Sequence, residues 1–431
     1  MAAVLTSTQV AGLLKEVYSP DGVITLIPDA MHILKSVKFS KAESVGDKFV
    51  QPVVVSKEHG YSYSGPGGGA FNLNPAISMN MKKALVDVYQ MVGKHSIDYD
   101  TMARASSGDK ASFQDATELQ MENAMTSATQ RLEIAALYGQ SGIGEAASSV
   151  NVGATSTTVT FTTATWSSGI WSGAEGAEVT FWDTVANTLI SSGDDSIFTV
   201  SNIDPDLHTV VFLGTATGIT ALDIGLAGAL KANVHLRGTR TGASTFGEMI
   251  GLKQIITNAG TMFNIDAAAN SLWRGNTYSA AGGTLTPAKL QSAVAKAVVR
   301  GLAEDVTVYV NPLTWGNLLN DQAALRRYDS SYKSAEINQG AKSIKFYSQS
   351  GSMEIVSHLY VKEGDAFIVP VSRLKRIGSY DLSFNTPGMS DEQMVRQLDG
   401  QAGYEFRTYT SQQIFCSQPS KTVFVTGIVN S

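Results

Sequence analysis

The stretch HGYSYSGPGGGAFNLNP, His59 to Pro75, contains the spacing in this chain that comes nearest to a known binding motif. Its centre, Gly65 to Ala70, satisfies the Gly-x-Gly-x-x-Ala pattern that holds the pyrophosphate of a dinucleotide. That chemistry needs a helix directly after the glycines, with its N-terminus facing the phosphates. Here Asn72, Asn74 and Pro75 follow, and the chain has no Gly-Lys-Ser/Thr of a P-loop. We therefore predict a loop tip and no cofactor-binding residues.

Residues for metal or nucleophile chemistry are scattered along the chain. The six histidines form no His-x-x-x-His pair, and a single cysteine, Cys416, excludes a multi-cysteine metal site and an intrachain disulfide. No Gly-x-Ser-x-Gly stands between a strand and a helix. We expect no catalytic residues, no metal ligands and no enzyme. A structural calcium ion at the turn carboxylates stays an alternative to plain turns, which we favour; these are Asp194, Asp195, Asp204 and Asp206.

The composition indicates an assembly. Charged residues make up 16% of the 431 residues, against about 25% in an average soluble domain. The net charge of -6 argues against a protein that wraps nucleic acid. The densest basic group, Ser372 to Gly378, predicts an exposed strand or turn. The N-terminus does not read as a signal peptide, and no apolar run is long enough to span a membrane, so we expect a protein made in a cytoplasm.

The elements around the glycine cluster predict a long hairpin. Val45 to Val55 predicts a strand, and Pro52 places it at a sheet edge. Ile77 to Val92 predicts the returning strand. An isolated hairpin is only marginally stable in water, so we predict that this arm lies across a neighbouring copy of the chain. The predicted contact residues are Phe49, Val53, Val55, Tyr61, Tyr63, Gly65, Pro66, Gly67, Phe71 and Leu73.

Two helices are predicted beside the hairpin. Thr6 to Tyr18 predicts a short amphipathic helix near the N-terminus. Ser112 to Gly139 predicts a long helix, with Ser112 as its N-cap and Gly139 as its stop. Its apolar stripe is Met121, Met125, Ala128, Leu132 and Ala135, and its length is about 40 Å at about 1.5 Å per residue.

The composition then changes. Gly142 to Gly238 is rich in Thr, Ser, Val and Gly, with short alternating runs that predict an inserted all-β module. Its tryptophans, Trp166, Trp171 and Trp182, either pack inside the module or stack on a sugar; we favour packing. An α/β pattern follows: helices over Phe246 to Gly260 and from Pro287, and a strand from Asp305 that leads through Asn311-Pro312 into another helix. The C-terminal part is rich in strands.

In this order, the elements resemble the major capsid protein of tailed bacteriophages, the Hong Kong 97-type fold. The runs GLKQIITNAGT, LTPAKLQSAVAKAVVRGL and VTVYVNPLTWGNLL carry the resemblance, with the hairpin and the solitary helix before them. It implies an α+β fold with these domains: an N-terminal arm (1–40), an extended hairpin loop (41–92), a peripheral domain with the spine helix (93–141), the inserted β domain (142–238), an axial domain (239–385) and a β-rich return (386–431). It places Asn311, Pro312 and Trp315 in the axial domain near the capsomer centre.

The function implied by the resemblance is structural. Copies would form pentamers and hexamers and close into an icosahedral shell around double-stranded DNA, in the virion capsid of a phage assembled in the host bacterial cytoplasm. Implied partners are the chain itself, portal and scaffolding proteins and decoration proteins, with DNA held by proximity and no membrane. Two alternatives stay open: an encapsulin-like compartment, and a carbohydrate-binding protein or enzyme centred on the β module.

Overall fold

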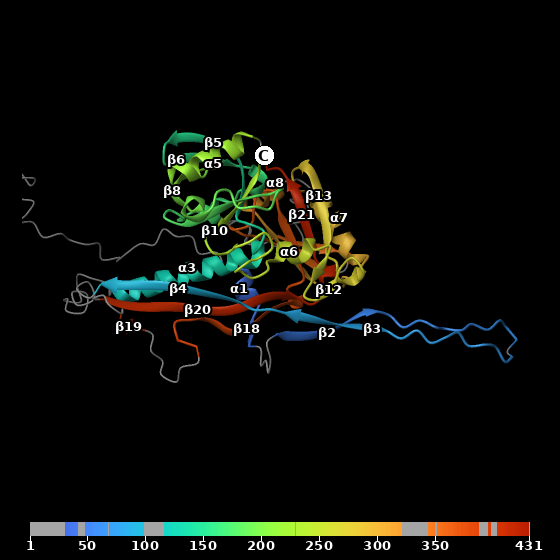
Figure 1. The fold of residues 1–431 in the computed structure, drawn as a ribbon. Coiled ribbons are helices and arrows are strands. Elements are labelled where there is room, and N and C mark those ends of the chain that lie inside the picture. Colours follow the sequence, from blue (N-terminus) through green and yellow to red (C-terminus); the bar gives the residue numbers. More distant parts are fainter. Residues whose placement is uncertain are drawn as a thin grey trace, which may run out of the picture.

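The computed structural model shows a body of sheets and helices from which one thin ribbon projects (Figure 1). It describes residues 31–41, 48–67, 69–98, 116–228, 230–320, 344–349, 351–387, 395–397 and 403–430. The predicted helix over Thr6 to Tyr18 and the predicted N-cap Ser112 lie outside these residues.

A long sheet forms the base of the body. Strand β20 (Gly403–Cys416) is its centre and pairs with β4 (Tyr89–Asp98) along one edge. Along the other edge it pairs with β18 (Leu374–Ser383) and the short β19 (Val395–Gln397), and β1 (Phe39–Lys41) adds to β18 in parallel. The basic run predicted as exposed lies in β18, where Leu374, Arg376 and Ile377 are buried. The predicted strand is therefore present, and Ser372 and Lys375 are exposed, but the exposure predicted for the rest of the run was wrong because β18 is an inner strand between β1 and β20.

The predicted spine helix is α3 (Ala116–Tyr138), which lies along β4 and β20 (Figure 1). Of the predicted stripe, Ala128 and Leu132 are buried, but nearly every residue from Leu132 to Gly139 is buried as well. The C-terminal half is enclosed because the short α1 (Ile33–Ser36) and α6 (Leu252–Thr257) also pack on it. Gly139 ends the helix, as predicted, and a Cβ there would lie 2.1 Å from the Met249 carbonyl oxygen.

The inserted module is a closed antiparallel barrel in the order β10-β5-β6-β9-β8-β7. Its interior is filled by aromatic side chains, among them Phe161, Phe181, Phe198 and Phe212, so the barrel is a packed core. Helix α5, which the sequence pattern did not predict, packs on β5 and β6. The bounds are β5 (Gly144–Gly153), β6 (Ser156–Phe161), α4 (Ser168–Trp171), β7 (Glu178–Asp183), β8 (Phe198–Asp204), β9 (Thr209–Leu213), α5 (Ala216–Ala227) and β10 (Ala232–Leu236).

A second sheet, in the order β13-β21-β17-β14-β16-β15, carries the α/β pattern. Alternate residues of β14 face opposite sides: Val308 and Val310 pack with α7 and α8, whereas Tyr309 joins the core beneath the barrel. Thr286 caps α7 and Pro287 takes its first position, as predicted. The bounds are β13 (Asn276–Gly283), α7 (Pro287–Val298), β14 (Val306–Val310), α8 (Pro312–Asn320), β15 (Ile344–Ser348), β16 (Gly351–Ser357), β17 (Ala366–Val369) and β21 (Val423–Ile428).

The helix predicted from Phe246 is shorter than expected, because α6 begins at Leu252. The segment before it bonds to other parts of the chain. Gln413 accepts a hydrogen bond from the Ile250 N–H at 2.9 Å and donates one to the Ile250 carbonyl at 2.9 Å. Gly251 lies against Gly139, where a Cβ would come within 2.4 Å of the Gly139 nitrogen. Tertiary contacts therefore take up the backbone groups that a longer helix would need.

The ribbon is a separate two-stranded sheet of β2 (Phe49–Ser56) and β3 (Asn80–Val86). The strand predicted over Ile77 to Val92 is thus two strands: β3 returns along the ribbon, and β4 continues into the base sheet. Beside β3 lies the small hairpin of β11 (Thr261–Met262) and β12 (Ile265–Asp266), where Leu85 donates a hydrogen bond to the Phe263 carbonyl at 3.0 Å. The limits of the predicted domains stay predictions.

Candidate assembly surfaces

The base of the ribbon has one covered and one open face. Along β2, burial alternates residue by residue, as a strand resting on a body requires. Phe49 and Val53 pack against the core of their own chain and Val55 is buried, whereas Val50 and Val54 face outward. We had predicted Phe49, Val53 and Val55 as contacts to a neighbour. Their own chain covers much of that face, so the open face of β2 is the one with Val50 and Val54.

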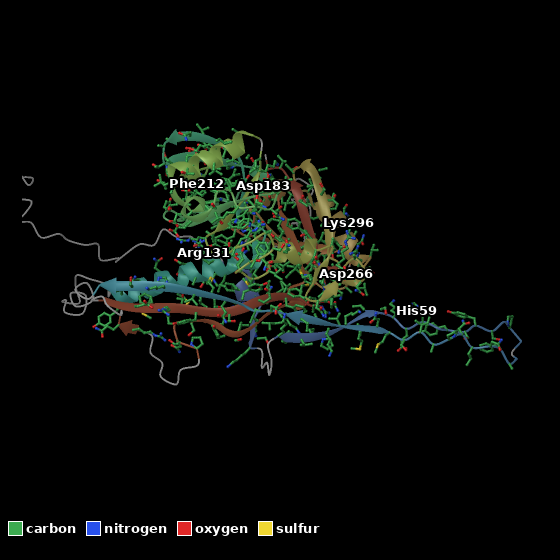
Figure 2. The ribbon with its side chains drawn as sticks, in the orientation of Figure 1. His59, Arg131, Asp183, Phe212, Asp266 and Lys296 are labelled. Atoms are coloured by element: carbon green, nitrogen blue, oxygen red, sulfur yellow. The ribbon has the colours of Figure 1, made fainter. Side chains whose placement is uncertain are left out.

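The outer part of the ribbon is open on both faces. Tyr61 is 68% exposed, Tyr63 87% and Leu73 79%, and Phe71 is also exposed. Beyond His59, Figure 2 shows the outer ribbon and its side chains with no other described part of the chain beside them. Gly65, Pro66 and Gly67 form the tip; Gly67 has a φ of 127°, which disfavours any residue with a side chain. The predicted aromatic arm is therefore present and uncovered.

Beyond β2 and β3, a few separate hydrogen bonds hold the two arms of the ribbon together, although the arms form no continuous pair of strands there. Asn74 donates from its side chain to the Tyr61 carbonyl at 2.9 Å, and its N–H donates to the Ser62 hydroxyl at 2.6 Å. His59 and Ile77 form an isolated antiparallel bridge. These bonds fix the pairing of the arms but bury no apolar surface, so they cannot stabilise the exposed aromatic rings.

The residues predicted for the capsomer centre differ in their burial. Asn311 is buried and uses its side chain inside the fold, donating to the Val361 carbonyl at 2.7 Å and accepting from the Leu313 N–H at 2.9 Å. It positions the start of α8 and presents no surface. Trp315 packs partly buried against the sheet. Leu313, which the sequence pattern did not single out, is the exposed apolar residue of the first turn, beside Pro312.

A buried carboxylate fastens the first described segment to the spine helix. Glu133 of α3 accepts hydrogen bonds from the N–H groups of His32, Ile33 and Leu34 at 2.9, 2.6 and 2.9 Å. His358 lies 2.9 Å away on the same carboxylate. Burial alone would raise the pKa of Glu133, but the hydrogen bonds from His358 and from this backbone hold it below its ordinary value. No motif predicts this contact between Glu133 and the first described segment.

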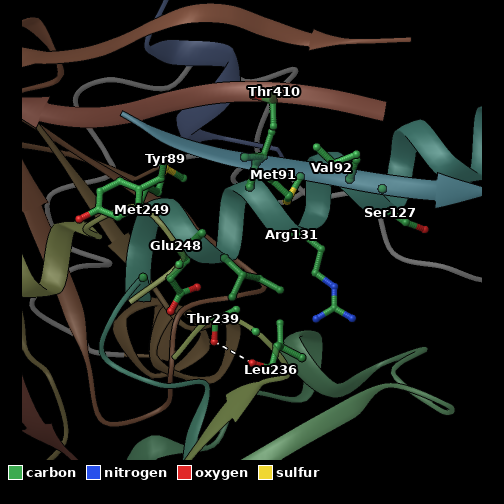
Figure 3. Close-up of a pocket in the computed structure, with 18 of the residues that line it drawn as sticks. Tyr89, Met91, Val92, Ser127, Arg131, Leu236, Thr239, Glu248, Met249 and Thr410 are labelled. Atoms are coloured by element: carbon green, nitrogen blue, oxygen red, sulfur yellow. Dashed lines mark hydrogen bonds between the residues drawn. The ribbon is translucent and has the colours of Figure 1, made fainter. Parts of the chain in front are cut away.

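A cavity of about 740 Å³ lies between the spine helix, strand β4 and the barrel. In Figure 3, Arg131 extends from α3 into this space, below β4 and above Leu236, with Met91 and Glu248 beside it. Burial raises the pKa of Glu248 to about 7, although it accepts a hydrogen bond from the Gln140 N–H at 2.8 Å. Burial, with the nearby positive charges of Arg240 and Lys362 acting in the same direction, lowers the pKa of His235, in the wall of the cavity, to about 3. His235 is therefore neutral at pH 7.

A second polar cluster lies where the barrel meets the sheet built around β14. Lys362 is buried, donates to the Gly142 carbonyl at 3.0 Å and lies 4.3 Å from the centre of the Tyr138 ring. Burial, with nearby Lys253, lowers the pKa of Lys362 to about 7. Asp365 lies 3.6 Å from Lys253. Opposite charges therefore lie close together in this cluster, although the buried Asp365 Oδ2 atom has no hydrogen-bond partner among the described residues.

The tryptophans considered for sugar binding are all buried in the module or at its base. Trp166 and Trp171 stack on each other with their ring centres 6.1 Å apart, and Arg240 covers Trp182 at 4.2 Å. No open aromatic face remains on them, so they are packing residues, as favoured above. Of the predicted turn carboxylates, Asp204 accepts hydrogen bonds from the N–H groups of Asp206 and Leu207.

The described residues carry no sign of a metal centre or of a membrane-spanning helix. They contain no group of three or more His, Cys, Asp or Glu side chains placed to hold a metal ion. Among the same residues, no helix is both long and apolar enough to cross a membrane.

Comparison with solved structures places the fold. The chain is similar to the capsid asymmetric unit of cyanophage A-1(L), with a TM-score of 0.51 and 10% identity over 98% of this chain and 99% of that one. It is similar to the capsid of the empty GTA particle, with a TM-score of 0.51 and 8% identity over 99% and 100%. The SrpI encapsulin of Synechococcus elongatus reaches a TM-score of 0.41 at 8% identity over 99% and 96%, which is too low to support an inference.

No family model and no curated protein matches the sequence. At such low identity the likeness concerns the fold alone. It covers nearly the whole of both chains. In this chain the ribbon, the spine helix and the sheet built around β14 follow one another in the predicted order. This chain therefore has the capsid fold of tailed bacteriophages, the Hong Kong 97-type fold that its order of elements predicts.

Proposed function

We propose that this chain is the major capsid protein of a tailed bacteriophage, a structural protein without enzymatic activity. Copies associate into pentamers and hexamers and close into an icosahedral shell around double-stranded DNA. The observation that carries this proposal is the ribbon: its outer aromatic and aliphatic side chains have no cover within the described chain, although the body from which it projects is well packed.

The physical argument is a balance of burial. Covering one tyrosine or leucine side chain stabilises an assembly by about 1.5–3 kcal/mol, and the ribbon presents several of them. In isolation the same residues face water and favour association with any complementary surface. A ring of identical subunits supplies that surface, because each copy both offers a ribbon and receives one. Many modest contacts per subunit then make a closed shell stable.

The low charge and acidic balance fit the inner side of such a shell. A net charge of -6 gives packaged DNA no overall attraction to the wall, so the duplex can be moved during packaging. Portal, scaffolding and decoration proteins are the further partners that this role implies. The proposed place of the protein is the virion capsid, assembled in the cytoplasm of the host bacterium.

The test is assembly of the expressed chain. We expect closed megadalton particles in sedimentation and negative-stain microscopy, and we expect deletion of Gly65 to Ala70 to abolish them while the subunit stays folded by circular dichroism. The matched control replaces the same six residues with a Gly-Ser loop of equal length. Monomers or small oligomers of the wild-type chain would contradict the proposal. Particles of unchanged yield after the deletion would contradict the role of the ribbon, and particles that take up a host enzyme instead of DNA would favour the encapsulin-like alternative.

A further inference from the structure

The cavity beside the spine helix contains polar groups that its own chain leaves without partners. His235 is 2% exposed and Thr408 is 1% exposed, and both line the cavity. The His235 Nδ1 atom and the Thr408 hydroxyl have no hydrogen-bond partner among the described residues. A buried polar atom left unpaired costs about 1–3 kcal/mol, so two of them lining one cavity indicate that something else occupies the space.

The cavity wall beside Thr408 is open because the residue opposite it has no side chain. Gly93 lies opposite it on β4, and a Cβ at that position would come within 2.4 Å of the Thr408 hydroxyl oxygen. The absence of a side chain at Gly93 therefore keeps the space over this hydroxyl open. The rest of the lining is mostly apolar, including Met91, Leu132 and Met249. Val92 at the same strand is 53% exposed, so the cavity reaches the surface.

Two arginines line the cavity, Arg131 and Arg237, and Arg237 forms an ion pair with Glu178. The other guanidinium is that of Arg131. It extends from α3 toward the open space (Figure 3). A guanidinium stacks well on the face of an aromatic ring, and this contact strengthens as water is excluded. An apolar cavity with a stacking cation, an unpaired hydroxyl and an unpaired ring nitrogen fits a phenol, whose ring is apolar and whose hydroxyl both donates and accepts.

The chain itself carries exposed phenols on the ribbon. Tyr63 stands near the tip and is the most exposed of the ribbon's large apolar side chains, and Tyr61 precedes it. From Ser56 to Tyr63 the arm extends about 23 Å at about 3.3 Å per residue, beyond the end of β2. It therefore extends well beyond the body of its own subunit. Leu73 and Phe71 also lie on the outer ribbon, but neither has a hydroxyl for the unpaired groups.

We propose that this cavity is the socket for the ribbon of a neighbouring copy, with Tyr63 of that copy inserted beside Arg131 and toward His235 and Thr408. The proposal rests on the proposed shell function and names the contact within it. Insertion pairs at least one of the orphaned polar atoms and buries a ring that otherwise faces water. The occupant is a second copy of this chain, and a small molecule or ordered water in the same space is the competing outcome.

Site-directed cross-linking tests the contact. In the variant with Tyr63→Cys and Ser127→Cys, a short bismaleimide reagent added to assembled particles is expected to join subunits into a ladder on a denaturing gel. Ser127 lines the cavity on α3. The matched control pairs Tyr63→Cys with Val152→Cys, which is 63% exposed on β5 of the barrel and outside the cavity lining. Cys416 is fully buried, so the wild-type chain gives the background.

The outcomes separate this proposal from the proposed function. Particles that form but cross-link no more than the Val152 control would overturn the socket and leave the shell standing. A wild-type chain that forms no particles would overturn both. If the double variant fails to assemble, Tyr63→Phe decides: loss of the hydroxyl is expected to raise the concentration needed for assembly about fivefold, the effect of one net hydrogen bond. Tyr61→Phe is the control, and equal effects of the two substitutions would contradict the socket.

Discussion

The β2–β3 ribbon and the six-stranded barrel are both antiparallel and both contain many valine and aromatic residues, yet they bury their side chains in opposite ways. The barrel closes on itself, so each strand has two partners and Phe181 and Phe212 lie fully inside. The ribbon has two strands and two open edges, and Tyr61 and Tyr63 face water. Closure thus lets the barrel bury its side chains between its own strands, whereas an open ribbon leaves them exposed for a second molecule to cover.

The largest expected effect is in the barrel. Trp171 is 1% exposed and packs against Phe161 and Phe212. Trp171→Ala should lower the free energy of unfolding of the unassembled subunit by about 3–5 kcal/mol, because it leaves a large cavity in a closed core. Urea unfolding followed by tryptophan fluorescence and circular dichroism measures this change. A loss below about 1 kcal/mol would mean that the barrel is not a packed core, and the contrast with the ribbon would fail.

An intermediate, pH-dependent effect is expected at the cavity below the barrel. Because burial raises the pKa of Glu248 to about 7, the folded chain holds a proton there that the unfolded chain releases near its ordinary pKa. Stability is therefore full below the unfolded pKa and falls as the pH rises through about 7. Glu248→Gln should remove this loss and stabilise the subunit at pH 8 by about 1–2 kcal/mol, since the side chain lines an accessible cavity and part of the shift is screened.

The control for the Glu248→Gln variant is the same comparison with the wild type at a lower pH. At pH 4 the wild-type carboxyl is protonated in the folded chain, so the variant and the wild type should differ by less than about 0.5 kcal/mol. Thermal or urea unfolding at the two pH values gives both numbers. A gain that is equal at pH 4 and pH 8 would show that the glutamine acts through packing and that the carboxyl does not titrate in this range.

The smallest effect on the subunit is expected on the ribbon. Tyr63→Ser should change the free energy of unfolding of the unassembled chain by less than about 0.5 kcal/mol, because the ring touches nothing in its own molecule. The same substitution should sharply reduce the yield of particles, measured by sedimentation. Val152→Ser, on an exposed residue of the barrel, is the matched control for both measurements. A large loss of subunit stability would mean that the ribbon packs on its own body.

Much of the fold could be predicted from local patterns. The C-terminal stop of α3 at Gly139, the cap of α7 at Thr286 and the barrel strands β6, β7, β8 and β9 follow from signals within a few residues. The predictions that failed concern segments whose partners are distant in sequence. The segment before α6 bonds to Gln413, and the basic run in β18 is covered by β1 and β20. A local pattern contains no information on such neighbours.

The same limit applies to the assembly surfaces. Alternation and glycine content marked the ribbon and its tip, but not which face of β2 rests on its own body. Asn311 drew attention by its place before Pro312, and the structure shows that its amide is used inside the fold. The cavity was not foreseen, since its walls come from α3, β4, β10 and β20, which lie far apart along the chain.

The amino-acid order alone determined most of the helices and strands, the β module that interrupts an α/β pattern, and the long arm that ends in glycines. These features depend on backbone conformation and on the spacing of apolar residues, which neighbouring positions decide. Only the tertiary structure decided which apolar side chains stay uncovered, which buried polar atoms stay unpaired and where a space is left beside the spine helix. Burial and hydrogen bonding are properties of chains brought together, so they emerge only when distant segments meet.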